Sequence, residues 1–102
     1  MTEAQLLALV KQCLSIISTA TAKDDEIKMW IKAGKQDMIR QGIQVDTYIT
    51  DCLVQGGIVM YVKGHFGFVE EKEKELALRT YKSIVENLSL TQSYIGGEVW
   101  EI

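Results

Sequence analysis

The sequence has 102 residues, a length that suits one domain with a single small hydrophobic core. Hydrophobic residues make up 47% of the chain and charged residues 25%, which is typical of a soluble globular protein and excludes a wholly disordered one. The formal net charge of −3 argues against a general nucleic-acid-binding surface, because such a surface needs clustered lysine and arginine to displace counterions.

The pattern of apolar residues indicates an all-α fold. The chain contains no proline, and apolar side chains recur at spacings of three and four in several long segments. We therefore predict a small bundle of four to five helices that forms one domain over residues 1–95, followed by an irregular or extended tail over residues 96–102. No apolar run approaches the roughly 18 residues of a membrane helix, and the N-terminus lacks the basic region of a signal peptide, so we expect a soluble protein with no membrane partner.

The first helix is predicted over residues 3–17. Thr2 followed by Gln5 fits a capping box, in which each side chain accepts a hydrogen bond from the other residue's backbone N–H. One apolar stripe is expected to face the core. It consists of Leu6, Leu7, Val10, Cys13, Leu14 and Ile17.

The second helix is predicted over residues 25–41, with Asp24 as its N-cap. Gly34 costs about 1 kcal/mol relative to alanine in a helix interior, which suggests that another helix crosses closely at this position. Gly42 fits the left-handed position that follows a helix, and Ile43 fits the apolar residue after it in a Schellman ending.

The third helix is predicted to begin between Asp46 and Asp51, with Asp46 or Thr50 as its cap, and to end near residues 64–67. The adjacent glycines at 56 and 57 again indicate close packing. Its buried face is expected to comprise Val54, Gly57, Ile58, Tyr61 and Val62.

The fourth helix is predicted over residues 69–88, with one apolar and one charged side. The pairs Glu70–Lys74 and Glu75–Arg79 have the favourable i,i+4 order, and we interpret the charged run as a solvated helix face. The apolar stripe consists of Ala77, Tyr81, Ile84, Val85 and Leu88.

His65, the only histidine, lies at the corner between the third and fourth helices. Gly64 and Gly67 would permit a tight turn, and Phe66 and Phe68 would fill it with apolar area. A catalytic histidine normally has an orienting partner, and the sequence offers none here. We therefore interpret His65 as a polar residue on the rim of the corner.

The sequence contains no recognisable catalytic or metal-binding motif. It has no phosphate-binding loop, no H-E-x-x-H and no G-x-S-x-G. Cys13 and Cys52 form no C-x-x-C pair, and both are predicted to be small buried apolar residues. We expect no cofactor, no metal and no enzymatic activity. An enzyme that uses His65, Cys52 and Glu71 is a remote alternative.

Some apolar residues are candidates for binding other proteins. Met29 and Ile39 fall off the main stripe of the second helix, and the tail ends in apolar and aromatic residues, which are enriched at interfaces. On this argument alone, packing within the chain is an equal alternative. Trp100 and Ile102 are expected to pack against protein, in the same chain or in a partner. The candidate interface residues are Met29, Ile39, Tyr94, Val99, Trp100 and Ile102.

Three stretches of the sequence resemble a known family. They are DDEIKMWIKAGKQDM (residues 24–38), QGGIVMYVKGHFGF (residues 55–68) and YKSIVENLSLTQSY (residues 81–94). In this order they resemble the small head–tail connector proteins of long-tailed phages and Gram-positive prophages, which are also called adaptor, head-completion or DNA-packaging proteins. The resemblance covers most of the chain, and its motifs are structural rather than catalytic.

The resemblance implies a structural virion protein at the phage neck. It implies a homo-oligomeric ring, of about a dozen copies, that sits on the portal protein and contacts a downstream neck or tail-completion protein. DNA would pass through the ring transiently and without sequence specificity. The protein would be in the host cytoplasm before assembly, and its function would require no reaction and no membrane.

A small helical DNA-binding or regulatory protein is the main alternative. Four short helices can accommodate a helix-turn-helix motif, in which one helix enters the major groove. The basic residues that could support this role lie on the second helix and are Lys28, Lys32, Lys35 and Arg40.

Overall fold

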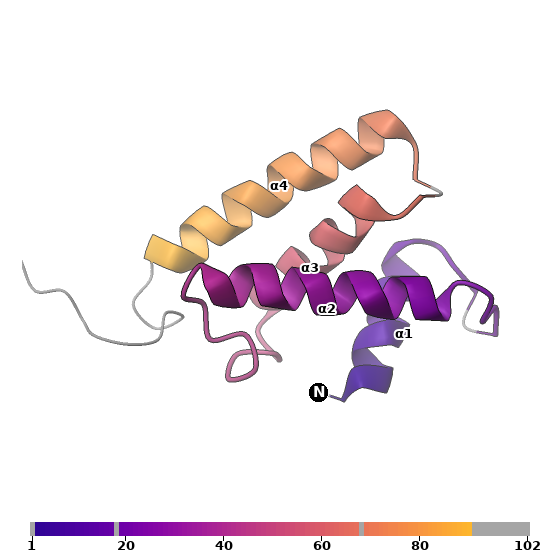
Figure 1. Cartoon of the computed structure of the whole chain (residues 1–102), viewed down its shortest axis with the longest axis horizontal. Coiled ribbons are helices and arrows are strands. Elements are labelled where there is room, and N and C mark those ends of the chain that lie inside the picture. The colour runs from indigo at the N-terminus through magenta and orange to yellow at the C-terminus, as the bar shows by residue number, and fades with distance from the viewer. Residues whose placement is uncertain (1, 18, 68, 91–102) are drawn as a thin grey trace, which may run out of the picture.

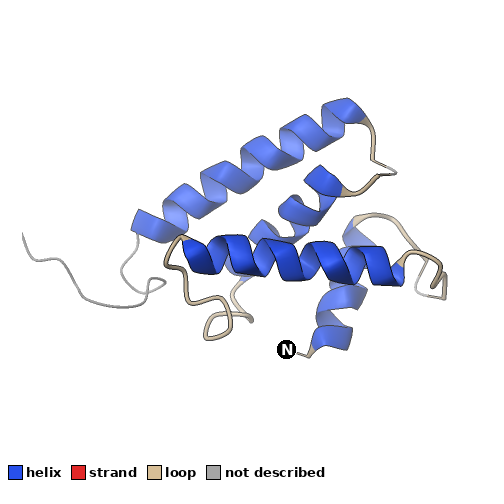
Figure 2. Ribbon diagram, viewed as in Figure 1, coloured by secondary structure: helices blue, strands red, loops and turns tan. Residues whose placement is uncertain are grey.

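The computed structural model describes residues 2–17, 19–67 and 69–90, which form four α-helices (Figures 1 and 2). The helices are α1 (Glu3–Cys13), α2 (Asp24–Arg40), α3 (Cys52–His65) and α4 (Glu71–Leu90). No β-strand occurs within these residues, so the all-α prediction is confirmed. Residues 91–95 of the predicted domain and the predicted tail, residues 96–102, lie outside the described part of the chain.

Helix α3 is the centre of the packing. It lies along α4 and also packs on α2 and α1, while α1 contacts α2 and α3 (Figure 1). A helix surrounded in this way is apolar on most sides, and α3 carries few charges. The core is built from all four helices and includes Leu6, Val10, Ile27, Met38, Val54, Ile58, Val62, Val85 and Leu88.

Helix α1 begins as predicted and ends earlier than predicted. The capping box is present, because the Thr2 backbone N–H donates to Gln5 Oε1 (2.9 Å) and the Gln5 N–H donates to Thr2 Oγ1 (3.1 Å). The helix stops at Cys13, since Ser15 adopts a left-handed backbone conformation with φ of 60°. The Ile16 N–H then donates to the Lys11 carbonyl (2.8 Å), which closes a Schellman-type ending without glycine. Ile17, predicted to lie on the core stripe, is 72% exposed.

The prediction that Asp24 caps α2 is wrong. Lys23 occupies the N-cap position, and Asp24 is the first helical residue. The Asp24 carboxylate instead lies 2.9 Å from the Nζ of Lys11, whose side chain also donates to the Ala20 carbonyl at 2.7 Å. Lys11 is only 4% exposed, and a buried ammonium group needs such partners to offset its lost hydration. This ion pair joins α1 to the start of α2.

Two predictions about glycines in α2 and its ending are confirmed. Gly42 has φ of 88°, and the Gly42 and Ile43 N–H groups donate to Ile39 and Met38 carbonyls in the Schellman pattern. A Cβ atom on Gly34 would lie 2.9 Å from Cδ1 of Tyr61. Gly34 therefore allows α3 to cross α2 closely, as its position in the sequence predicted.

Helix α3 begins one residue after the predicted range. Its N-cap is Asp51, whose side chain accepts a hydrogen bond from the Leu53 N–H at 2.8 Å, and neither Asp46 nor Thr50 has this role. Asp46 is 3.0 Å from Lys35 of α2 instead. The loop between α2 and α3 is thus tied to the middle of α2.

The ends of α3 and α4 differ from the predictions in detail. Gly64 lies inside α3, where an added Cβ would overlap the side chain of Leu78, so it serves the crossing of α3 and α4 rather than a turn. Helix α4 begins at Glu71 and extends to Leu90. Within the described residues neither expected i,i+4 ion pair forms, and Lys74 lies 3.9 Å from Glu71.

The prediction that both cysteines are buried is wrong. Cys13 is the last residue of α1 and Cys52 the first residue of α3, and both side chains are exposed. A residue at a helix end can satisfy the spacing of an apolar stripe and still lie beyond the neighbouring helix that would cover it.

Candidate functional site

His65 at the end of α3 stacks between two aromatic rings. Its ring centroid lies 4.9 Å from that of Trp30 and 4.3 Å from that of Tyr61, with interplanar angles of 25° and 30°. Its Nδ1 atom is 2.8 Å from the Tyr61 carbonyl oxygen. His65 is therefore half-buried and packs between α2 and α3. This corrects the prediction that it lies on the rim of the corner between the third and fourth helices. Phe66 is buried as predicted, and Phe68 lies outside the described residues.

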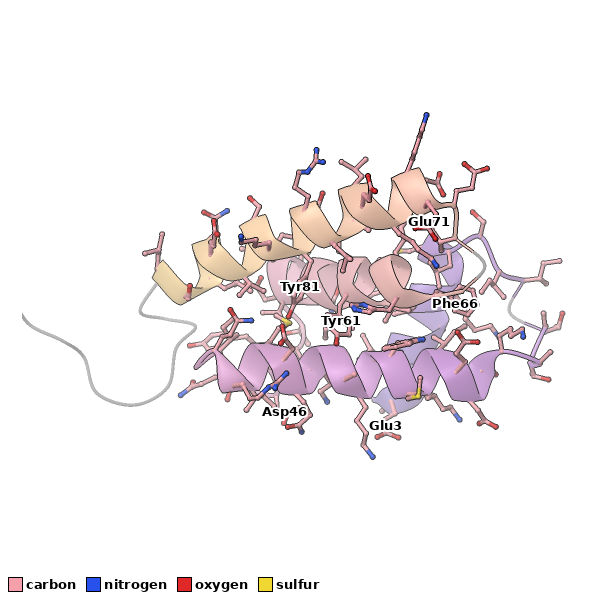
Figure 3. The ribbon with its side chains drawn as sticks, turned by 45° about the horizontal axis from the view of Figure 1, so that its top comes forward. Glu3, Asp46, Tyr61, Phe66, Glu71 and Tyr81 are labelled. Carbon is pink, nitrogen blue, oxygen red and sulfur yellow. The ribbon has the colours of Figure 1, made fainter. Side chains whose placement is uncertain are left out.

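The aromatic cluster continues from α3 to α4. Tyr61 contacts Tyr81 edge to face, with ring centroids 5.1 Å apart. The Tyr81 hydroxyl donates a hydrogen bond of 2.5 Å to Asp37 of α2, which also binds Arg40 at 3.1 Å. Burial and the bond to the Asp37 carboxylate raise the pKa of Tyr81 well above its usual value, so the phenol stays neutral. The labelled Tyr61 and Tyr81 lie on the side of α2 that faces α4 (Figure 3).

These contacts do not assemble the residues of the enzyme alternative. Cys52 and His65 are the first and last residues of α3, about 20 Å apart along the helix axis. Glu71 is exposed at the start of α4. Within the part of the chain that the structure describes, no three histidine, cysteine, aspartate or glutamate side chains form a potential metal site.

The opposite side of α2 contains an open groove of about 520 Å³. Its floor includes Met29 and Ile39, whose side chains are 52% and 40% exposed. Glu3 of α1 forms one wall, and Asp46 of the following loop forms another. Figure 3 shows these two residues on the same side of α2, away from Tyr81. The groove therefore combines parts of the chain that are distant in sequence.

The groove carries equal numbers of lysines and carboxylates, and among the described residues only one of each, Lys35 and Asp46, forms an ion pair. Its lining contains three lysines (28, 32 and 35) and three carboxylates (3, 25 and 46). Lys35 is held by Asp46 at 3.0 Å. Lys28 and Lys32 are exposed, lie one turn apart beside Met29, and form no ion pair with any described residue. Such a surface can bind an apolar segment that also carries carboxylates.

Comparison with protein families identifies the chain. The model of the family described as phage connector protein matches residues 6–95, a span that includes α2, α3 and α4. The chain belongs to the phage connector protein family. This match confirms the resemblance seen in the three sequence stretches. No curated protein and no solved structure matches the connector significantly.

The predicted interface residues of the connector divide into two sets. Met29 and Ile39 are both exposed and both line the groove on α2. The remaining predicted residues, Tyr94, Val99, Trp100 and Ile102, lie outside the described part of the chain. Sequence reasoning missed several exposed apolar residues, because they occupy helix ends or the charged side of α4: Leu53, Leu76 and Leu90.

The basic residues of the connector's α2 do not form a free cluster. Lys35 is paired with Asp46, and Arg40 lies 3.1 Å from Asp37. Pairing with carboxylates lowers the positive potential that phosphate binding requires.

Among the described residues, none of the helices combines the length and the apolar character of a membrane-spanning segment.

Proposed function

We propose that this connector protein forms a ring at the virion neck, where it joins the portal to the tail or to the next neck protein and extends the DNA channel. The observation that carries the proposal is the family match over residues 6–95. The groove on α2 supports it, because a connector needs a surface that binds another protein.

The charge of the chain supports a role in which DNA passes without binding. The net charge is −3, and part of the basic set on α2 is neutralised by Asp37 and Asp46. A channel wall of this kind repels phosphate and lets DNA slide. The contact with DNA is transient and non-specific, and the protein resides in the host cytoplasm before it joins the virion.

The small core supports assembly from several copies. A chain of this length buries only about two thirds of its unfolded surface, so additional burial between identical subunits contributes to stability. Met29 and Ile39 offer exposed apolar area for such burial.

The proposal is tested with the portal protein of the same phage. The connector is measured by static light scattering alone and with the portal, and the complexes are imaged by electron microscopy. We expect a ring of connector subunits on the portal. A connector that remains monomeric at high concentration and also ignores its portal contradicts the proposal. A monomer without the portal does not, because the portal can template the ring.

A further inference from the structure

We infer that the groove on α2 of one copy binds residues 98–101 of a neighbouring copy. The inference rests on the proposed ring and names the contact that would link its subunits. The groove supplies an apolar floor, Met29 and Ile39, and beside it two ammonium groups, Lys28 and Lys32, that form no ion pair with any described residue. Glu3 and Asp25 of the lining also lack such a pair, so an acidic occupant must place its carboxylates at Lys28 and Lys32. Apolar side chains flanked by carboxylates match this part of the groove.

Residues 98–101 have that pattern. Their sequence is Glu-Val-Trp-Glu, an apolar pair between two acidic residues. In an extended segment Glu98 and Trp100 share one face, and Glu101 lies on the other with its Cα atom about 10 Å from that of Glu98. The Cα atoms of Lys28 and Lys32 are about 6 Å apart on the helix, so one long lysine side chain would meet Glu98 in the groove and the other would reach Glu101 at its rim. Burial of a tryptophan removes roughly 150–250 Å² from water, which makes Trp100 the main anchor.

The position of the end of α4 favours a neighbouring copy over the same chain. The C-terminal end of α4 lies beside the C-terminal end of α2, and the loop over residues 41–51 lies under that same end (Figure 1). Asp46 of this loop forms a wall of the groove. A segment leaving Leu90 would have to pass around the loop to enter its own groove. The eight residue steps from 90 to 98 span up to about 28 Å, a length that can carry residues 98–101 away from their own chain to a neighbouring one.

A contact of this kind can build a ring. The segment that leaves α4 and the groove on α2 are different surfaces, so each copy donates to one neighbour and accepts from the other. Such a heterologous contact repeats from copy to copy and closes when the rotation permits. A two-fold contact between identical surfaces would stop at a dimer.

The test uses full-length chains in which Trp30→Phe leaves Trp100 as the sole tryptophan. One variant adds Lys28→Glu and Lys32→Glu, and a second adds Glu98→Lys and Glu101→Lys. A matched control adds Lys72→Glu, which changes an exposed lysine of α4. Trp100 emission and light scattering are recorded from micromolar to millimolar concentration under reducing conditions. Circular dichroism confirms that each variant is folded.

We expect the emission of the parent and of the control to shift to the blue as concentration and molar mass rise. Each charge-reversed chain alone should require at least about tenfold higher concentration to show the same shift, because the groove of one copy and the tail of the next now carry charges of the same sign. An equimolar mixture of the two reversed chains should recover the parent behaviour. In an alternating arrangement every tail meets a groove of opposite charge, which cannot occur within one chain.

Three results overturn the inference. The first is a blue shift of Trp100 emission that does not depend on concentration, which would mean that the tail docks within its own chain. The second is no shift at any concentration, and the third is an equimolar mixture that does not recover the association of the parent. These results are distinguishable from failure of the proposed function. If Trp100 stays exposed while rings form on the portal, the inference alone is wrong. If copies associate through the tail and ignore the portal, the neck function is wrong.

Discussion

The two faces of α2 show how one helix serves stability and recognition separately. The inner face is held by specific contacts: Gly34 against Tyr61, Trp30 against His65, and Asp37 against Tyr81. The outer face has an open groove with exposed apolar side chains and two lysines that form no ion pair with the residues the structure describes. Changes on the inner face should therefore alter folding, and changes on the outer face should alter association. The predictions below test this separation, beginning with the largest effect.

Two methionines provide the sharpest contrast. Met38 is fully buried on the inner face, so Met38→Ala should lower the free energy of unfolding by about 2–5 kcal/mol. Met29→Ala on the outer face should change it by less than about 0.5 kcal/mol while weakening self-association. Urea denaturation and light scattering measure the two effects. Equal destabilisation by both variants would show that the outer face belongs to the core.

Two glycines of helix interiors should respond to alanine with opposite signs. Gly34→Ala places a methyl group 2.9 Å from the Tyr61 ring and should destabilise the protein by about 1–3 kcal/mol. At Gly56 the nearest side-chain atom is 3.9 Å away, so Gly56→Ala should stabilise by up to about 1 kcal/mol through helix propensity. Chemical denaturation of both variants checks the signs. A stabilised Gly34→Ala would refute the close crossing of α2 and α3.

The Tyr81–Asp37 hydrogen bond should give stability a specific dependence on alkaline pH. Because the pKa of Tyr81 is raised in the folded state, the unfolded chain loses this proton first as pH rises. The contribution is complete below about pH 10 and is lost progressively above it. The unfolding free energy is measured at about pH 9 and about pH 11, on either side of this value. Tyr81→Phe should be destabilised by about 1–3 kcal/mol at the lower pH and lose less on going to the higher one.

The smallest effect is expected at His65. His65→Ala removes stacking with Trp30 and Tyr61 and should cost about 1 kcal/mol, whereas His65→Phe retains the stacking and should be nearly neutral. Thermal denaturation distinguishes the two variants. If both variants fold normally and both lose portal binding, the histidine has a role beyond packing.

Local patterns allowed much of the fold to be predicted. The capping box at Thr2 and the Schellman ending at Gly42 depend on a few adjacent residues, and both are present. Long-range partners could not be predicted in this way. Lys11 has the sequence character of a surface residue, and only the packing of α1 on α2 shows that Asp24 is its counterion. The left-handed conformation of Ser15 likewise has no clear sequence signal.

The candidate site was predictable only in part. Met29 and Ile39 were identified because they fall off the apolar stripe of α2. The walls of the groove come from Glu3 and Asp46, which are separated from α2 in sequence and are brought to it by folding. Residue spacing within one helix carries no information about such walls. Whether the groove residues and the tail residues form an interface remains a prediction.

The ion pair between Lys11 and Asp24 has a thermodynamic consequence for the groove. Helix α1 supplies Glu3 and Leu6 to the groove lining and is joined to α2 through this pair. Any occupant that contacts both helices must also favour the docked position of α1, since binding and local folding are linked equilibria. Slowed amide hydrogen exchange in α1 would therefore report occupancy of the groove even when the occupant itself is invisible to the measurement.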